Sequence, residues 1–364
     1  MEKKKAAAFF KRALGFVCVT IIALTLVSGA YLSFFFIVHQ PVETGAREES
    51  ADFVFDINAL NYMDVGDDGS FSIMLLSDLH MTFGAAVLRD KKTYDGISKA
   101  LETQNPDLVI VNGDAWATPL NLPSLTTFAD FMESKRVYWA YAFGNHDSEF
   151  GFSKTRLVNK LKEYEYCVFD EGPKNITGNS NYFINLRKGG DIVYTLSIID
   201  SNEYVKYRKI YDYVHADQME WFGRTLDAIR AAAGGIVPVS VFQHIPVPEF
   251  KEVYDSLLAD GYFDTHLSDK GVYSPDYNSG FLSFLEAAGG VDAMFFAHDH
   301  YNDFGGYAPG SSIYMQYGYC SGYMANLTKE LDRGVTMVYL GLGADGFLTL
   351  DPSRDIKHIM YGEM

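Results

Sequence analysis

The sequence predicts an α/β domain in which two β-sheets lie between layers of helices. In the first half of the domain, apolar runs alternate with helical stretches, which indicates parallel strands joined by crossover helices. Toward the end of the chain, three strand candidates follow one another with glycine-rich turns and no helix between them. A hydrophobic content of 48% allows a sizeable core, and an aromatic content of 15% favours a strand-rich architecture.

The first elements of the domain are predicted as a β-meander over residues 52–75, with a turn at 67–69. A strand over 71–77 is followed by a helix over 91–103, a strand over 108–111, a helix over 124–133 and a strand over 137–143. A helix over 154–163, a hairpin of strands 182–186 and 192–199, and a long helix over 216–233 come next. The remaining strands are predicted over 236–242, 291–296, 313–319, 335–340 and 347–350, with a helix over 279–288.

The N-terminal region differs from the rest of the chain. Basic residues at positions 3, 4, 5, 11 and 12 precede an apolar run over residues 13–38 that contains no charged residue. As a helix, this run would span roughly 39 Å, enough for a tilted crossing of a hydrocarbon core of about 30 Å. We therefore predict a basic cytoplasmic region over 1–12 and a transmembrane signal-anchor over 13–38, which makes the protein single-pass with residues 40–364 extracytoplasmic.

A cleaved signal peptide is the alternative to an anchor. Ser28, Gly29 and Ala30 are the small residues that a signal peptidase requires. The apolar run continues past that site to Val38, which favours the anchor, and cleavage would give a secreted protein instead. Residues 39–51 are polar and acidic and are predicted to form a stalk, and residues 52–364 are predicted to form one domain.

The exported part of the chain is strongly acidic. The whole chain has a formal charge of −17, of which residues 1–40 contribute +4, so the remainder carries −21. Such a surface repels polyanions and argues against nucleic acid as a partner. The sequence indicates no protein partner. Outside the apolar run, Cys167 and Cys320 either form a disulfide or stay as two buried thiols, and both alternatives are open.

Polar blocks follow five of the predicted strands. They are Ser77-Asp78-Leu79-His80, Asn112-Gly113-Asp114, Gly144-Asn145-His146-Asp147, Gln243-His244 and Ala297-His298-Asp299-His300. Each block alone has a simpler explanation as a turn or as an edge histidine with a structural partner. Because the carboxyl ends of parallel strands share one edge of a sheet, the five blocks together deliver carboxylates, imidazoles and an amide to one place. A metal centre requires that combination, and core packing does not.

Seven of these side chains are candidate metal ligands: Asp78, His80, Asp114, Asn145, His244, His298 and His300. Mixed carboxylate and imidazole donors suit Zn, Fe or Mn rather than Mg or Ca. Seven donors exceed the needs of one tetrahedral ion, whereas two ions about 3.5–4 Å apart that share a carboxylate would use them all. Such a pair would generate a bridging hydroxide near neutral pH and stabilise charge during displacement at phosphorus.

The order and content of these blocks resemble the calcineurin-like metallophosphoesterase superfamily. The resemblance implies a four-layer α/β/β/α sandwich of two mixed sheets, with a phosphoester as substrate. It also implies that Asp78, His80 and His300 hold one metal ion, that Asn145, His244 and His298 hold the other, and that Asp114 bridges the two. His146 would stabilise or protonate the leaving oxygen, with Asp147 behind it.

The segments around the blocks are similar to a branch related to purple acid phosphatases, which includes exported and membrane-tethered phosphatases. The purple enzymes carry a tyrosine three residues after the bridging aspartate, whereas this chain has Ala117 at that position. The absence of that phenolate leaves Fe, Mn and Zn open as the two ions.

The sequence therefore predicts a membrane-anchored, metal-dependent phosphoric ester hydrolase. The resemblance favours phosphomonoesters, and a phosphodiesterase with the same dimetal core is the first alternative. A catalytically silent metal-binding scaffold is the alternative from another class, and a metal-dependent hydrolase of non-phosphate bonds is a third. The sequence retains every expected donor and His146, which argues against the silent scaffold.

Overall fold

The computed structural model describes residues 14–27, 60–82, 87–205, 210–261, 271–326 and 331–364. The chain divides into two compact units, Met1–Glu43 and Thr44–Met364. In the first unit, residues 14–27 are helical. Within the described ranges, no helix has the length and apolar character needed to span a bilayer. Of the transmembrane segment expected over 13–38, residues 13 and 28–38 lie outside the described residues, as does the expected stalk over 39–51.

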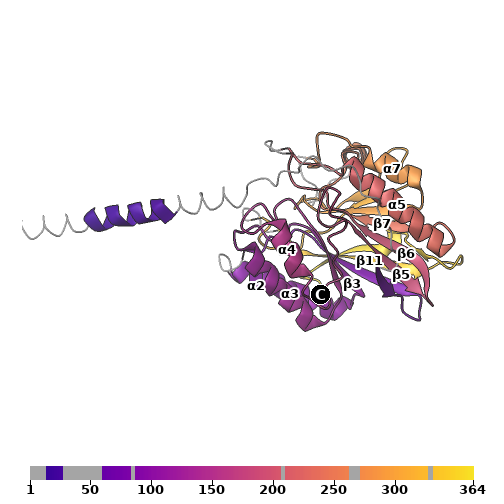
Figure 1. Ribbon diagram of the computed structural model, residues 1–364, viewed down its shortest axis with the longest axis horizontal. Helices are drawn as coiled ribbons and strands as arrows, with labels where there is room; N and C mark the ends of the chain where they lie inside the picture. The colour runs from indigo at the N-terminus through magenta and orange to yellow at the C-terminus, as the bar shows by residue number, and fades with distance from the viewer. Residues whose placement is uncertain (1–13, 28–59, 83–86, 206–209, 262–270, 327–330) are drawn as a thin grey trace, which may run out of the picture. The chain divides into compact units, whose positions relative to one another are not determined.

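The second unit contains two mixed β-sheets (Figure 1). The larger sheet has seven strands in the order β1-β5-β6-β7-β8-β10-β9. Strands β6, β7, β8 and β10 run parallel to one another, so their carboxyl ends lie at the same edge. The bounds are β1 Asn61–Asp64, β5 Tyr182–Lys188, β6 Asp191–Ile198, β7 Val239–Phe242, β8 Val291–Phe296, β9 Gly305–Tyr307 and β10 Tyr314–Tyr317.

The smaller sheet has six strands, in the order β12-β11-β2-β3-β4 with β13 also paired to β11. Strands β2, β3 and β4 are parallel, and β11 runs antiparallel to β2. The bounds are β2 Ser70–Leu76, β3 Leu108–Asn112, β4 Trp139–Ala142, β11 Gly334–Leu342, β12 Leu348–Thr349 and β13 Ile356–Met360.

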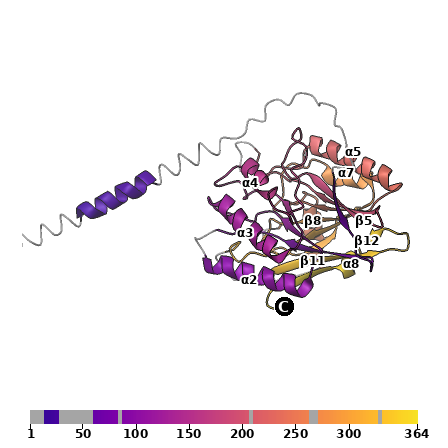
Figure 2. The ribbon, with the colours of Figure 1, turned by 60° about the horizontal axis from the view of Figure 1, so that its bottom comes forward.

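Helices form the two outer layers of this unit. Figures 1 and 2 show α2, α3 and α4 on one side of the sheets and α5 and α7 on the other. Helix α2 contacts β11, whereas α5 contacts β6 and α7 contacts β8. The two mixed sheets and their helical layers confirm the predicted α/β/β/α sandwich. The bounds are α2 Val87–Gln104, α3 Asn121–Lys135, α4 Lys154–Leu161, α5 Ala216–Ala233, α6 Phe250–Ala259, α7 Phe281–Ala288 and α8 Pro352–Asp355.

Apolar side chains fill the layers and hold the strand ends in place. One buried cluster joins residues of both sheets, including Leu76, Ile110, Leu196 and Phe295, to the α2–α4 side. A second cluster fills the space between the larger sheet and α5 and α7. All five residues of β3 are buried, as expected for a parallel strand covered on both faces. Full burial of each such aliphatic or aromatic side chain contributes about 1.5–3 kcal/mol.

The predicted β-meander is wrong. Strand β1 pairs in parallel with β5 of the larger sheet, whereas β2 belongs to the smaller sheet, and residues 52–59 lie outside the described part of the chain. The turn itself is present: the Gly69 N–H donates to the Gly66 carbonyl at 2.9 Å, and Gly69 has a φ of 75°. The turn therefore leads the chain from one sheet into the other and does not close a hairpin.

The structure also adds to the predicted elements and shortens some of them. Helices α6 and α8 and strands β9 and β13 were absent from the sequence-based prediction. Strand β7 begins at Val239, directly after Pro238, because proline has no N–H for the sheet. In the part of the chain that the structure describes, Cys167 and Cys320 are free, so the disulfide alternative is wrong for this structure.

Candidate metal centre

Backbone hydrogen bonds join the block after β2 to the block after β3, and the block after β7 to the block after β8. The His80 N–H donates to the Asp114 carbonyl at 3.0 Å, and the Ala297 N–H donates to the His244 carbonyl at 2.9 Å. Gly113 has a φ of 89°, and a Cβ there would lie 2.5 Å from His244 Nδ1. Only glycine gives the left-handed turn and the close approach that this position needs.

Two groups of donors meet at this edge and share one carboxylate. Asp78, His80, Asp114 and His300 form the first group, and Asp114, His244 and His298 form the second. In each group, one ligand atom from every residue lies within 4.8 Å of the others. All members except His300 are buried. The structure thus brings together six of the seven predicted ligands from four separate strand ends, those of β2, β3, β7 and β8.

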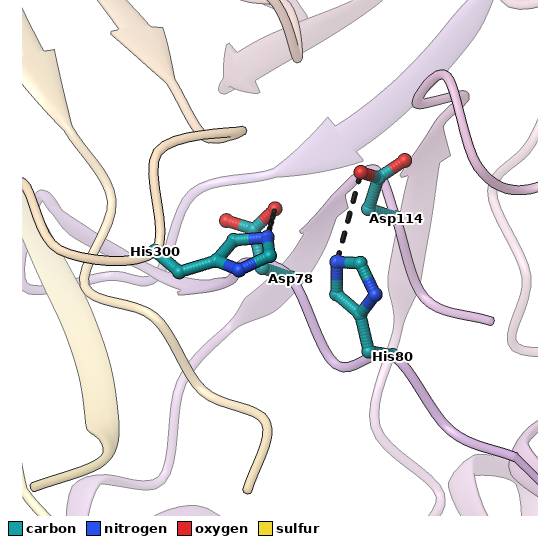
Figure 3. A group of neighbouring side chains, drawn as sticks. All are labelled: Asp78, His80, Asp114 and His300. Carbon is teal, nitrogen blue, oxygen red and sulfur yellow. Dashed lines mark ion pairs between the residues drawn. The ribbon is translucent and has the colours of Figure 1, made fainter. Parts of the chain in front are cut away.

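In the first group, each imidazole lies beside one of the two carboxylates. His300 Nε2 lies 3.6 Å from Asp78 Oδ1, and His80 Nε2 lies 3.7 Å from Asp114 Oδ2 (Figure 3). Both separations exceed a hydrogen bond, and the two rings are 4.5 Å apart at their centroids. One ligand atom from each of the four side chains therefore lies close enough to the others to share a single metal ion.

In the second group, His244 is fixed in a ligating orientation. Its Nδ1 lies 2.9 Å from the Asn112 carbonyl oxygen, to which a protonated Nδ1 donates, so Nε2 is turned toward Asp114 Oδ2 at 3.1 Å. A hydrogen bond at one ring nitrogen that leaves the other for a metal is the usual arrangement of a metal-binding histidine. The seventh predicted ligand, Asn145, is fully buried and donates from Nδ2 to Tyr204 Oη at 3.0 Å.

Buried polar atoms without hydrogen-bond partners gather at this site. Among the described residues they include His80 Nε2, Asp114 Oδ2, Asn145 Oδ1, His244 Nε2 and both ring nitrogens of His298. A buried donor or acceptor left unpaired costs about 1–3 kcal/mol, so such a concentration needs a compensating partner. Every one of these groups is a good ligand for a transition-metal ion, and the residues therefore fit a metal pair.

The backbone is strained at the same residues. Asp78, His80, Asp114 and His298 have φ values of 53°, 47°, 51° and 80°. A non-glycine residue in this region costs on the order of 1–3 kcal/mol and persists only where the surroundings impose it. The short loops after each strand turn these four side chains inward at that cost.

Burial and mutual repulsion keep most of the imidazoles neutral. Burial holds the pKa of His80 and His298 well below the ordinary value and lowers the pKa of His300 to about 4. Burial also raises the pKa of Asp78 to about 8, with the neighbouring Asp114 adding to the effect. At His244, burial lowers the pKa, but the Asp114 carboxylate outweighs it and raises the pKa to about 9. Neutral imidazoles are the form that binds metal.

His146 lies at the rim of the site, and its carboxylate partner differs from the predicted one. Its ring centroid is 5.4 Å from that of His80, and its Nδ1 contacts Glu149 Oε2. Asp147 was predicted to lie behind His146. Instead, its carboxylate accepts hydrogen bonds from the backbone N–H groups of Asp114 at 3.1 Å, Ala115 at 2.8 Å and Gly144 at 2.7 Å. Asp147 therefore holds two of the loops together, and Glu149 orients the histidine.

No role in the site was predicted for Asn112 or Tyr204. Asn112 was visible as the first residue of a polar block, but only the structure shows its contact with His244. Tyr204 lies 59 residues after Asn145, and no local pattern connects them.

Two donor groups around a shared carboxylate, at the strand ends of an α/β/β/α sandwich, define the class of dimetal phosphoesterases. Comparison with known proteins agrees with this. Residues 71–302 match the family described as calcineurin-like phosphoesterase, and the chain belongs to that family.

Curated relatives include proteins named as purple acid phosphatases. The chain is 28% identical over 310 residues to "Probable inactive purple acid phosphatase 29" of Arabidopsis thaliana, covering 76% of this chain and 78% of that protein. It is 26% identical over 309 residues to "Phosphatase DCR2" of Saccharomyces cerevisiae, where it spans 76% of this chain but 49% of the yeast protein. Among solved structures, a dimetal phosphatase from Danio rerio has a TM-score of 0.51 at 12% identity, covering 80% of this chain and 99% of that one, which shows a shared fold.

Proposed function

We propose that this protein is a binuclear metal-dependent phosphoesterase that hydrolyses phosphomonoesters. The observation that carries the proposal is Asp114, whose carboxylate belongs to both donor groups. The residues present fit two ions: Asp78, His80 and His300 would hold one, Asn145, His244 and His298 the other, and Asp114 both. When bound, such a pair supplies an activated water and positive charge for the phosphoryl oxygens.

The chain's own contribution to the reaction would come from His146. Its backbone N–H donates to Asp114 Oδ1 at 2.7 Å, which fixes the residue beside the shared carboxylate. Because Glu149 occupies Nδ1, Nε2 is the nitrogen that would give a proton to the leaving oxygen. The raised pKa of His146 fits a proton donor: burial lowers it, but Asp114 and Glu149 outweigh burial and bring it to about 9.

Metal analysis with a pair of substrates tests this proposal. We expect two equivalents of Zn, Mn or Fe per chain and faster hydrolysis of p-nitrophenyl phosphate than of its bis ester. His146→Ala should lower turnover about 10²–10⁴-fold while leaving the metal content unchanged. A large preference for the bis ester would establish the phosphodiesterase alternative instead.

A catalytically silent scaffold is the second candidate, and one observation favours it. An Arabidopsis relative is named "probable inactive", whereas the yeast relative is named a phosphatase. Purified protein that holds two metal ions and hydrolyses no phosphoester would support the silent scaffold. The same preparation, if active on carboxylic esters or amides and insensitive to phosphate, would support hydrolysis of non-phosphate bonds.

The proposed location is the outer side of a membrane, with the N-terminal segment as a single anchor. Its support is the sequence: basic residues on one flank and an uncharged apolar run over residues 13–38. We expect the full chain to stay in the membrane fraction after carbonate extraction at alkaline pH. External protease added to intact cells should remove the second unit. Release into the medium of a chain that begins near residue 31 would establish cleavage.

A further inference from the structure

Two short antiparallel segments carry tyrosines to the second donor group. The Val205 N–H donates to the Ile210 carbonyl at 2.9 Å, and the Asp212 N–H donates to the Glu203 carbonyl at 3.2 Å. Tyr204 and Tyr211 face each other across this pair, with ring centroids 5.6 Å apart. Both side chains are half-buried. The two segments lie outside the five strand ends that supply the predicted ligands.

Tyr204 contacts the nitrogen end of the Asn145 amide. Asn145 Nδ2 donates to Tyr204 Oη at 3.0 Å, while Asn145 Oδ1 is buried with no hydrogen-bond partner in the described residues. Only the oxygen of an amide can ligate a metal ion. Because the phenol accepts from the nitrogen, it fixes the amide and leaves the oxygen as the atom available to a metal ion.

Tyr211 packs against the ring of His298 and so restricts its orientation. The two rings meet edge to face, with centroids 4.5 Å apart and planes at 88°. Both nitrogens of His298 lack a hydrogen-bond partner within the described part of the chain, in contrast to His244, whose Nδ1 faces a backbone carbonyl. The orientation of the His298 ring is therefore set by its neighbours' packing, of which Tyr211 is one.

The base of the two segments is fastened to the loop that carries Asn145. Glu203 accepts from the Ser148 hydroxyl and pairs with Lys154 Nζ at 3.3 Å. Lys154 also binds Asp200 at 3.0 Å, and these charges are buried or half-buried. From the other side, Asn202 Nδ2 donates to the Tyr213 carbonyl at 2.8 Å. These hydrogen bonds and ion pairs hold the backbone on both sides of the tyrosines in place.

We propose that Tyr204 and Tyr211 are positioning residues that set the affinity of the second metal position, the one formed by Asn145, His244 and His298. This inference rests on the proposed function, because it presupposes two metal ions. Groups that orient metal ligands typically change metal affinity 10–100-fold when removed. The first position, around Asp78, His80 and His300, contacts neither tyrosine in the hydrogen bonds and ring contacts of the described residues, so it should keep its affinity.

The test is a metal titration of the full chain against a chromogenic chelator, with Zn²⁺ and Mn²⁺ in separate experiments. Tyr204→Phe removes one oxygen atom, and Tyr211→Leu removes the ring. Tyr213→Phe is the matched control, because Tyr213 continues the same segment but stacks on His215, with centroids 4.6 Å apart. We expect each test variant to weaken the second equivalent 10–100-fold and to leave the first unchanged, and the control to match the wild type.

Each outcome decides between the proposals. A wild type that binds fewer than two equivalents overturns the proposed function and this inference with it. A wild type that binds two, with Tyr204→Phe unchanged or with both equivalents weakened alike, overturns this inference alone. Circular dichroism of the metal-free proteins identifies any loss of fold in Tyr211→Leu, in which case Tyr204→Phe carries the test by itself.

Discussion

His146, Asp147 and Glu149 lie within one turn of the chain, but their side chains have separate partners. The Glu149 N–H donates to the His146 carbonyl at 3.2 Å, which brings the carboxylate back to the imidazole of the same turn. Asp147 points inward and binds backbone N–H groups of two loops. Adjacency in the sequence suggested the wrong acidic partner, because the direction of a side chain in an irregular turn depends on the hydrogen bonds that the turn has to satisfy.

We predict that Glu149→Gln acts on the chemical step through the leaving group. The amide can still contact His146 but no longer stabilises its protonated form, so proton donation should weaken. Turnover of phenyl phosphate, whose leaving group needs the proton, should fall about 10-fold or more. Turnover of p-nitrophenyl phosphate, which has a good leaving group, should fall much less. Steady-state kinetics on both substrates measure the difference.

Glu163→Gln is the control. Glu163 lies just after helix α4, its side chain is largely exposed, and it pairs with Lys160 of that helix at 2.7 Å. The control variant should turn over both substrates at the wild-type rate. Equal losses on the two substrates in Glu149→Gln would show that Glu149 serves binding or structure and not proton transfer.

The ligand set could be predicted from the sequence because each donor directly follows an apolar strand. Parallel strands bring such positions to one edge whatever the details of the loops. Asn112, Glu149 and Tyr204 could not be assigned in this way, because their roles depend on which atom of a neighbour each one meets. A strand-end rule predicts proximity, and hydrogen-bond geometry follows only from coordinates.

At the scale of single elements, the second residue of strand β8 is an aspartate, Asp292, whose charge opposes stability. Asp292 is half-buried and accepts a hydrogen bond from Tyr194 Oη of β6 at 3.1 Å. Burial raises the pKa of Asp292 from 3.8 to about 6, an effect only partly offset by the Tyr194 hydrogen bond. The folded protein therefore binds more protons than the unfolded chain between these two pKa values, and the free energy of unfolding falls as pH rises through that window.

We predict that Asp292→Asn stabilises the protein, and more at pH 7.5 than at pH 5. The amide keeps the acceptor for Tyr194 and carries no charge to desolvate. The gain should approach about 2–3 kcal/mol above pH 6 and shrink toward pH 4. Urea unfolding at the two pH values measures it. Asp191→Asn, at the exposed start of β6, should change little. A gain that does not depend on pH would contradict the titration argument.

Elements with strong periodicity were predictable, whereas strand partners were not. The bounds of α5 and β8 agree with the predicted ones because their apolar patterns are long and end at Gly234 and Ala297. The partner of β1 was wrong because a turn signal at residues 67–69 indicates only that the chain bends. Helix α6 buries Phe250, Val253 and Tyr254, whose spacing is that of one helix face. This spacing is visible in the sequence, so α6 was predictable although it was not predicted.

At the scale of the whole molecule, Asn112 joins the two sheets directly beneath the candidate metal centre. From the end of β3, its Nδ2 donates to the carbonyls of Gln243 at 3.1 Å and Phe295 at 3.2 Å. Gln243 directly follows β7, and Phe295 lies in β8, both of the larger sheet. Its own carbonyl oxygen accepts from His244. The side chain of Asn112 therefore joins the sheets while its backbone carbonyl orients a ligand, so one residue couples the packing of the sheets to the placement of His244.

We predict that Asn112→Ala lowers both stability and metal affinity. Loss of the two hydrogen bonds leaves a buried carbonyl unpaired and should cost about 1–3 kcal/mol in the free energy of unfolding. Because the sheets can then shift, His244 should lose alignment, and the metal equivalent it serves should bind about 10–100-fold more weakly. Chemical denaturation of the metal-free protein and a chelator titration measure the two effects.

Asn185→Ala provides the comparison. Asn185 is fully buried within the larger sheet and accepts from Thr195 Oγ1 at 2.9 Å, away from the strand ends. It should lose stability without losing metal affinity. If both variants lose stability equally and neither loses affinity, Asn112 is a structural residue only.

The overall architecture was predictable because alternating strands and helices restrict the topology to a few right-handed arrangements. The chain order of the five polar blocks then identified the family, which residues 71–302 match. The assignment of strands to the two sheets was not predictable, since several strands are apolar on both faces and could belong to either. The predicted anchor stays a prediction, because most of its C-terminal half lies outside the described residues.

The buried carboxylate of Asp78 lowers the thermal stability of the metal-free protein but is needed as a ligand in the proposed reaction. Without a cation, this 1% exposed side chain has to be ionised away from water and near the Asp114 carboxylate, or carry a proton, and either state weakens the fold. Asp78→Asn should therefore raise the melting temperature in chelator and lower it in saturating metal, where occupancy at 100 times Kd contributes about 2.7 kcal/mol. A laboratory selection for survival of heating under metal starvation would then enrich proteins that melt at a higher temperature and have lost a ligand of the proposed reaction.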